Sequence, residues 1–261
     1  MFRFPVISLL VIATLPCLAV TKKTHASNSQ ALNYAAQSIA ALTGGNSLTD
    51  VTLHGTATWT SGSDTESGSA TFLASGTAES RMDLALSSGT RTEIRDSQTG
   101  TTLGKWVTPA GTGMFALYNC QTDAAWFFPA LGSLAGGSNV VLSYIGQETR
   151  NGIAVQHLQS YVSQPSLPSL FGISTQTLST VDFYLDATTF LPSSVIFNIH
   201  PDTNAASNLS VEIDLSNYQL FSGVNVPTHI QKYLQGTLLV DVTVSSAAFN
   251  TGISLSTFSV N

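Results

Sequence analysis

Apolar and polar residues alternate strictly in several short segments of this chain, and this alternation restricts its fold more than any other feature. Apolar residues or glycine occupy every second position across 51–59, 181–185, 195–199 and 209–215. A period of two is typical of a strand with one buried face. Further strands are expected at 70–75, 80–86, 91–96, 103–108, 140–145, 153–162, 226–234 and 238–249. Short strands at regular spacing predict an antiparallel sandwich or barrel.

Turn signals separate these strands, as at Asp186 and at Gln235–Gly236. The segment 61–69 consists mainly of Ser, Gly, Asp and Thr. It is expected to be a loop because it is too polar for a core. A second loop is expected to begin at Ser163 and to carry a short helix near Leu170.

Two segments have the helical period instead. The first has apolar residues at 31, 34, 35, 39 and 42 and ends at Gly44–Asn46, which predicts one helix before the first strand. The second runs from Met114 to Leu134, with apolar residues at 114, 117, 118, 124, 125, 128 and 131. Pro129 would break or kink a helix here. Short helices are therefore expected in this segment, as a central plug against the sheet.

The first 26 residues have the features of an export signal. Arg3 supplies the positive start, an apolar run occupies 4–20, and Thr24–Ala26 fits a cleavage site. No repeat and no shift in composition divides the rest of the chain. We therefore expect a signal peptide at 1–26, a single domain at 27–261, and a periplasmic or secreted protein.

The leader leaves alternatives open. Cleavage after Ala19 also fits, and Lys22 and Lys23 directly after the apolar run are unusual for a cleaved signal. An uncleaved anchor is the other interpretation, although the run is shorter than the roughly 20 apolar residues that span a bilayer. Pro16 stands where a lipoprotein signal has a small residue, so no lipid anchor is expected at Cys17.

Charge is scarce and its balance is acidic. Charged residues make up 9% of the chain, against about 25% in typical soluble domains. Three of the nine basic residues lie in the leader, which leaves six basic and fifteen acidic residues, a formal charge of −9. This balance argues against a nucleic-acid partner. Cys120 is then the one cysteine of the domain, so it has no partner for an internal disulfide and is expected to be a buried small residue.

No catalytic or metal-binding motif is recognisable. GxSxG, HExxH and the Walker phosphate loop do not occur. The histidines of the domain fall on separate expected strands, and we expect each to be exposed or satisfied by a neighbour; they are His54, His157, His200 and His229. A Ser-His-Asp triad assembled from distant residues stays open. The acids at 182–186 and at 212–214 are expected to form solvated faces, and no cofactor is expected.

The aromatic cluster Trp126–Pro129 lies within the expected helical plug. Two interpretations are open. The cluster can form ordinary core against the sheet, or it can line or cover a cavity, and large apolar pockets are the usual ligand sites. A lid over an open sheet would do both.

The last third of the chain carries three local patterns. Phe183–Asp186 is followed by Phe190–Pro192, Tyr218 leads through Gly223–Pro227 to Ile230, and Val244–Asn250 precedes Phe258. In this order they resemble the strand-turn-strand, the "Y…G…P…I" strand and the closing strand and tail of the LolA-like envelope proteins. That group includes periplasmic lipoprotein carriers, their outer-membrane acceptors and related lipid-binding proteins.

The resemblance implies a mainly β (α+β) fold, a half-closed antiparallel β-barrel with an N-terminal helix and a central helical plug that shelters acyl chains. The residues expected to line its cavity are Trp59, Phe72, Met82, Phe115, Trp126, Phe127, Phe128, Leu131, Phe183 and Phe197. Carriers of this group use an arginine inside the cavity to regulate the lid. None of Arg81, Arg91, Arg95 and Arg150 can be matched to it from sequence.

Three functions follow, in order of preference. The first is a monomeric, non-enzymatic extracytoplasmic binding protein for a hydrophobic ligand, which is an acyl chain, a lipid or a lipoprotein. The second is an envelope interaction or sensor module that binds a protein partner across its sheet edge. The third is a secreted hydrolase with a dispersed site, placed last because no pocket of perturbed acids or bases is recognisable.

Overall fold

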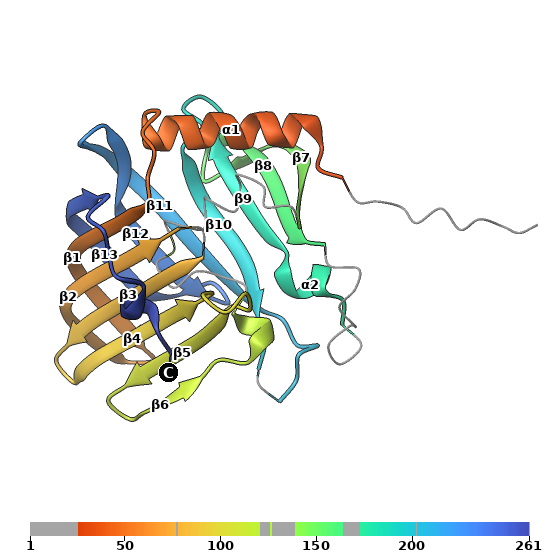
Figure 1. Cartoon of the computed structure of the whole chain (residues 1–261). Coiled ribbons are helices and arrows are strands. Elements are labelled where there is room, and N and C mark those ends of the chain that lie inside the picture. The colour runs from red at the N-terminus through yellow and green to blue at the C-terminus, as the bar shows by residue number, and fades with distance from the viewer. Residues whose placement is uncertain are drawn as a thin grey trace, which may run out of the picture.

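The computed structural model describes residues 26–76, 78–120, 126, 139–163, 173–201 and 203–260, and Figure 1 shows their arrangement. The helical elements are α1 (Ser29–Thr43), η1 (Leu117–Asn119), α2 (Thr175–Ser179) and η3 (Leu255–Phe258). The strands are β1 (Asp50–Ser61), β2 (Asp64–Ser75), β3 (Glu79–Leu86), β4 (Gly89–Asp96), β5 (Leu103–Thr108), β6 (Gly111–Met114), β7 (Val140–Arg150), β8 (Ile153–Val162), β9 (Val181–Asp186), β10 (Pro192–Ile199), β11 (Leu209–Phe221), β12 (Val224–Leu234) and β13 (Thr237–Phe249). The leader up to residue 25, with Cys17, lies outside the described residues.

The strands of the described residues form one 13-stranded sheet in the order β6-β5-β4-β3-β2-β1-β13-β12-β11-β10-β9-β8-β7. Neighbours in the sheet are neighbours in sequence except at its centre, where β1 pairs antiparallel with β13. The order ends at β6 on one side and at β7 on the other, and the curved sheet stays open between them (Figure 1). This is the mainly β, half-open antiparallel barrel that was predicted.

The polar segment 61–69 corrects one prediction. It is not a loop, because only Gly62 and Ser63 turn and β2 begins at Asp64, which pairs with Ser61. The first residues of β2 are largely exposed, yet their backbone remains paired with β1. The polar side chains of this segment show that the β1–β2 hairpin extends beyond the core. They do not prevent strand formation, because the hydrogen bonds between the strands are made by backbone groups.

The expected helical plug is corrected in part. Met114 ends strand β6, which pairs with β5, so the segment begins with a strand residue and not in a helix. The 3-10 helix η1 is one short helix of the kind expected. Apart from Trp126, the rest of the plug lies outside the described residues, as do Phe127, Phe128 and Leu131. The expected helix near Leu170 also lies outside them.

Helix α1 lies across one end of the half-barrel (Figure 1). It begins where the Asn28 side chain accepts hydrogen bonds from the backbone N–H groups of Gln30 and Ala31, at 2.9 and 3.1 Å. It ends at Gly44, whose φ of 58° suits glycine. Its apolar face is buried in the main core, as its helical period predicted. In the described ranges, no helix has the length and apolar content needed to cross a bilayer.

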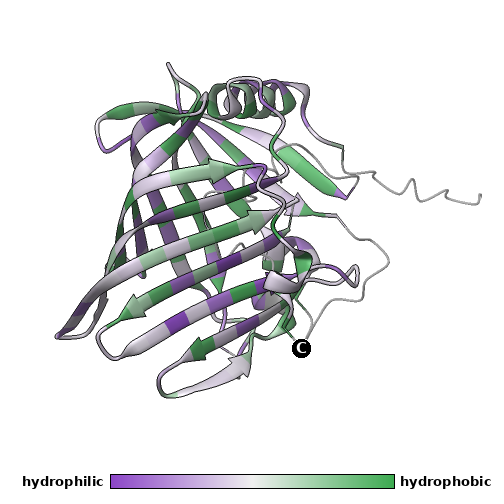
Figure 2. Cartoon of the chain, turned by 60° about the vertical axis from the view of Figure 1, so that its left-hand side comes forward, coloured by the Kyte–Doolittle hydropathy of each residue, from purple (hydrophilic) through white to green (hydrophobic). Residues whose placement is uncertain are grey.

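Alternation along the strands gives the sheet two faces. We call the face that carries the main core the inner face. Figure 2 shows apolar and polar residues alternating along the strands. The opposite, outer face is largely polar. Its exception is the C-terminal tail, where Phe258 and Val260 pack on Ile94 together with Leu73 and Leu103.

Candidate ligand-binding cavity

The inner face is hollowed between β3–β5 on one side and β10–β13 on the other. The larger hollow has a volume of about 260 Å³ and reaches from Met82 to Lys232. The smaller, about 110 Å³, reaches from Arg95 to Phe197. Both are lined by Glu93, Phe115 and Lys232, so we treat them as one cavity. An engineered apolar hollow of about 150 Å³ takes up benzene, so the cavity has room for part of an apolar ligand.

Aromatic rings form much of the cavity wall. The rings that line it belong to Trp59, Trp106, Phe115, Trp126 and Phe197. Trp59 and Trp106 point inward because their strand partners do: Trp59 pairs with Val240, and Trp106 pairs with Glu93. Together they give the apolar lining that ligand pockets usually have.

Three cations lie against three of the aromatic rings of the cavity. The Arg91 guanidinium lies 3.8 Å from the ring centroid of Trp59, and that of Arg95 lies 4.4 Å from that of Phe115. The Lys232 ammonium lies 4.7 Å from the ring centroid of Trp126. All three distances are within the range of cation–π attraction. The rings therefore stabilise positive charge inside a largely apolar site.

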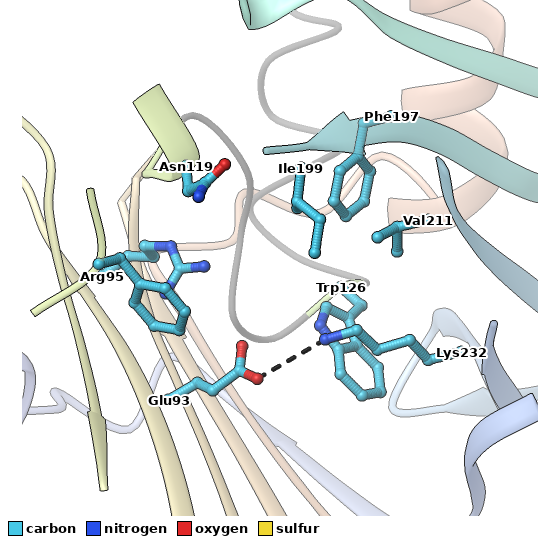
Figure 3. Close-up of a pocket in the computed structure, with 9 residues that line it drawn as sticks. Glu93, Arg95, Asn119, Trp126, Phe197, Ile199, Val211 and Lys232 are labelled. Atoms are coloured by element: carbon cyan, nitrogen blue, oxygen red, sulfur yellow. Dashed lines mark ion pairs between the residues drawn. The ribbon is translucent and has the colours of Figure 1, made fainter. Parts of the chain in front are cut away.

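The carboxylates of the inner face pair only loosely with these cations. Lys232 Nζ lies 3.6 Å from Glu93 Oε1, across the cavity in Figure 3. Arg91 Nη2 lies 3.8 Å from Glu66 Oε1. Both distances exceed the roughly 2.7–2.9 Å of a direct charge-assisted hydrogen bond. The cations are therefore attracted by these carboxylates without being hydrogen-bonded to them.

The η1 turn closes the end of the cavity away from α1. The Asn119 side chain donates to the His200 carbonyl at 2.7 Å and accepts from the His200 N–H at 2.9 Å. Ala116 packs beside Ile173 and Leu178, near α2. Cys120 is buried, and burial raises the pKa of its thiol. It is the buried small residue that was predicted.

Five of the predicted site residues line the cavity. They are Trp59, Met82, Phe115, Trp126 and Phe197. Phe72 and Phe183 are instead buried in the core at 2% and 1% exposure, with the Phe72 ring centroid 5.6 Å from that of Trp126. The structure places these two as support for the wall, and it does not describe Phe127, Phe128 or Leu131.

Sequence reasoning missed Trp106 and the charged groups of the cavity. Arg91, Glu93 and Arg95 occupy alternate positions of β4 and all line the cavity. Charged residues at every second position normally indicate the solvent face of a strand. Their register in the folded sheet places them inside, because Met82 and Leu84, on the neighbouring strand, pair with Glu93 and Arg91.

The outer face of the C-terminal half carries polar side chains in direct contact. His157 Nε2 lies 2.8 Å from Asp182 Oδ1, and Arg150 donates to Glu212 at 2.6 Å. Asp214 departs from the solvated face that was predicted. Burial, with a smaller effect of Glu212, raises its pKa to about 6. Among the described residues, no group of His, Cys, Asp and Glu is arranged to hold a metal ion.

Three outer-face residues form a chain of contacts like that of a Ser-His-Asp triad. Ser216 Oγ lies 3.3 Å from His229 Nδ1, and His229 Nε2 lies 2.9 Å from Asp241 Oδ1. Acyl transfer also needs a substrate pocket and donors aimed at the oxyanion. Neither hollow of the cavity borders these residues, which face outward from β11, β12 and β13. We interpret them as cross-strand polar contacts.

Comparison with solved structures agrees on the fold. A domain assigned to outer membrane lipoprotein sorting, from Vibrio parahaemolyticus, is 14% identical with a TM-score of 0.55, and the match covers 87% of this chain and 95% of that one. A LolA superfamily protein from Nitrosomonas europaea is 10% identical with a TM-score of 0.53, covering 88% and 97%. A DUF1329 family protein from Desulfovibrio piger is also 10% identical with a TM-score of 0.53, covering 88% and 96%. No protein-family model and no curated protein sequence matches the chain. The fold is LolA-like, as the local patterns predicted.

Proposed function

We propose that this chain is an exported, non-enzymatic binding protein of the cell envelope, with an acyl chain, lipid or lipoprotein as its hydrophobic ligand. The observation that carries the proposal is the cavity: Trp59, Trp106 and Phe115 line a hollow of about 260 Å³ on the inner face of an open sheet. Burial of one methylene is worth about 0.8 kcal/mol. A chain of several methylenes in a preformed hollow would therefore bind measurably.

Three observations support this proposal. The sheet is open between β6 and β7, so a ligand can reach the inner face without unfolding a closed barrel. The solved structures of similar fold include a domain assigned to lipoprotein sorting. The leader sequence supports export, since its positive start and apolar run are those of a signal peptide.

Ligand extraction tests the proposal directly. The protein is purified from its own envelope and its bound lipids are analysed by native mass spectrometry. The stripped protein is then titrated with a neutral apolar dye. We expect a co-purifying lipid and a saturable dye response. No lipid together with no dye response would overturn the proposal.

A second candidate function rests on the sheet edge at β7. Ser27 and Asn28 cover its first part, because the Asn28 N–H donates to the Leu142 carbonyl at 2.8 Å and Ser27 Oγ accepts from the Leu142 N–H at 3.0 Å. Among the described residues, no further strand pairs with the outer edge of 144–150. Such an edge is a template for adding a strand from a partner. A photo-crosslinking residue at Thr149 would then trap a protein from envelope extract, and one at Asp64 would not.

A further inference from the structure

The basic groups of this acidic chain are unevenly placed. Six basic residues follow the leader, at 81, 91, 95, 105, 150 and 232. Three of these six, Arg91, Arg95 and Lys232, line the cavity, and Glu93 is the only acidic residue that lines it within the described part of the chain. Binding of a purely apolar ligand would not require these three cations. Desolvating cations is costly unless they are paired or hydrogen-bonded.

Arg91 and Lys232 retain hydrogen-bonding capacity. Arg91 Nε is buried and has no hydrogen-bond partner among the described residues. Its nearest carboxylate, Glu66, is already engaged, because it accepts from the Ser88 N–H at 2.7 Å, from the Ser88 hydroxyl at 2.9 Å and from the Ser87 hydroxyl at 3.1 Å. These bonds lower the pKa of Glu66. Glu66 therefore remains a carboxylate that is directed at Ser87 and Ser88 and offers Arg91 only a distant charge.

Arginines on the outer face behave differently. Arg81 Nε donates to Asp83 at 2.7 Å, and Arg150 donates to Glu212 at 2.6 Å. The corresponding distances from Arg91 and Lys232 to their carboxylates are 3.8 and 3.6 Å. A buried donor without a partner lowers stability, and an anionic group placed between these cations would satisfy it.

The geometry points to an amphiphile whose anionic headgroup, a carboxylate or a phosphate, lies between Arg91 and Lys232 while its apolar chain lies along the aromatic wall. This inference rests on the proposed function and defines its ligand class. Both cations line the larger hollow. The planar guanidinium matches either anion with two parallel hydrogen bonds, and the ammonium adds a point charge. Cation–π contacts with Trp59 and Trp126 position Arg91 and Lys232, respectively.

Four ten-carbon amphiphiles distinguish the contribution of the headgroup to affinity from that of the apolar chain. Decanoate, decyl phosphate, decanol and decyltrimethylammonium are each tested for displacement of a neutral apolar dye from the purified protein. A hydrogen bond to a charged group contributes about 1.5–3 kcal/mol, so we expect at least one of the two anions to bind roughly tenfold more tightly than decanol. The trimethylammonium is expected to bind least. The better of the two anions identifies the headgroup.

Two variants test which residues provide the preference. Arg91→Gln and Lys232→Gln are each expected to lower the ratio of anion to decanol affinity toward one. Arg81→Gln, which removes an outer-face cation, is expected to keep the ratio. The ratio of anion to decanol affinity is measured only for variants whose dye response shows an intact cavity. Two cavity variants are used so that the test still works if one of them fails to fold.

The outcomes separate the two proposals. Equal binding of all four amphiphiles, or an unchanged ratio in both cavity variants, would overturn the anionic headgroup and leave the binding function standing. Failure of the dye and of every amphiphile would overturn the proposed function itself.

Discussion

The two faces of the sheet differ in how closely their cations pair with carboxylates. On the outer face, the ion pairs Arg81–Asp83 and Arg150–Glu212 are direct, at 2.7 and 2.6 Å. On the inner face, the carboxylates that pair with Arg91 and Lys232 are 3.6–3.8 Å away. Contact with an aromatic ring does not distinguish the faces, because Arg150 also lies 4.0 Å from the ring centroid of Tyr184. A direct ion pair satisfies the hydrogen-bond donors of its cation, whereas a loosely paired cation keeps donors that another group can bind. Under the proposed function, a ligand would complete the inner face, whereas ion pairs within the chain complete the outer face.

Removing an inner-face side chain is expected to have the largest effect on stability. Phe183 is 1% exposed and packs in the main core. Phe183→Ala is expected to lower the free energy of unfolding by about 3–5 kcal/mol, because it leaves a cavity in the core. Leu220→Ala, at a side chain that is 68% exposed, is the control and is expected to change it by less than about 0.5 kcal/mol. Denaturant unfolding measures both, and equal effects would contradict the placement of the core.

The apolar patch on the outer face is expected to matter less. Phe258 is fully buried, but its cluster is small and separate from the main core. Phe258→Ala is expected to cost about 1–3 kcal/mol, below the range for a main-core phenylalanine. Hydrogen exchange is expected to accelerate in 253–260 and to stay slow in β10 and β11. Loss of protection throughout the sheet would show instead that the tail supports the whole fold.

Asp214 gives the smallest expected effect, and the effect depends on pH. Its pKa is raised from 3.8 to about 6 in the folded protein, chiefly by burial. The folded state therefore holds the proton more tightly than the unfolded state, and the stability from this group is present below about pH 4 and is lost as the pH rises through about 6. Asp214→Asn is expected to raise the free energy of unfolding at pH 8 by about 1 kcal/mol or less, since solvent screens a partly exposed group.

Thermal unfolding at two pH values checks the Asp214 prediction. The gain is expected at pH 8 and is expected to vanish at pH 4, where Asp214 is protonated in the folded state. Asp64→Asn, at the exposed start of β2, is the control and is expected to change neither value. A gain of equal size at both pH values would count against the raised pKa.

Periodicity was enough to predict the helix and most strands, because burial of one face enforces a period of two within segments such as 181–185, 195–199 and 209–215. It failed at 61–69, where the hairpin extends into solvent and loses its apolar face while the backbone still pairs. It also failed at Met114, since a four-residue edge strand is too short to show a period.

The cavity was predictable only in its apolar half. The inward side chains of Trp59, Met82 and Phe197 follow from alternation. Arg91 and Lys232 could not be placed inside the barrel from sequence, because a charged residue on a strand ordinarily marks the solvent face. Their position depends on cross-strand register and on the aromatic rings they contact, and both are properties of the folded sheet.

The central claim is that the inner face binds an apolar ligand and the outer face does not. Titration of the stripped protein with a neutral apolar dye tests it on two matched aromatic substitutions, Trp106→Ala on the inner face and Tyr233→Ala on the outer face. The prediction is that Trp106→Ala weakens dye binding about tenfold, as expected for the loss of roughly 1.4 kcal/mol of apolar contact, and that Tyr233→Ala leaves it unchanged. Equal affinity in both variants, or a larger loss from Tyr233→Ala, would contradict the claim.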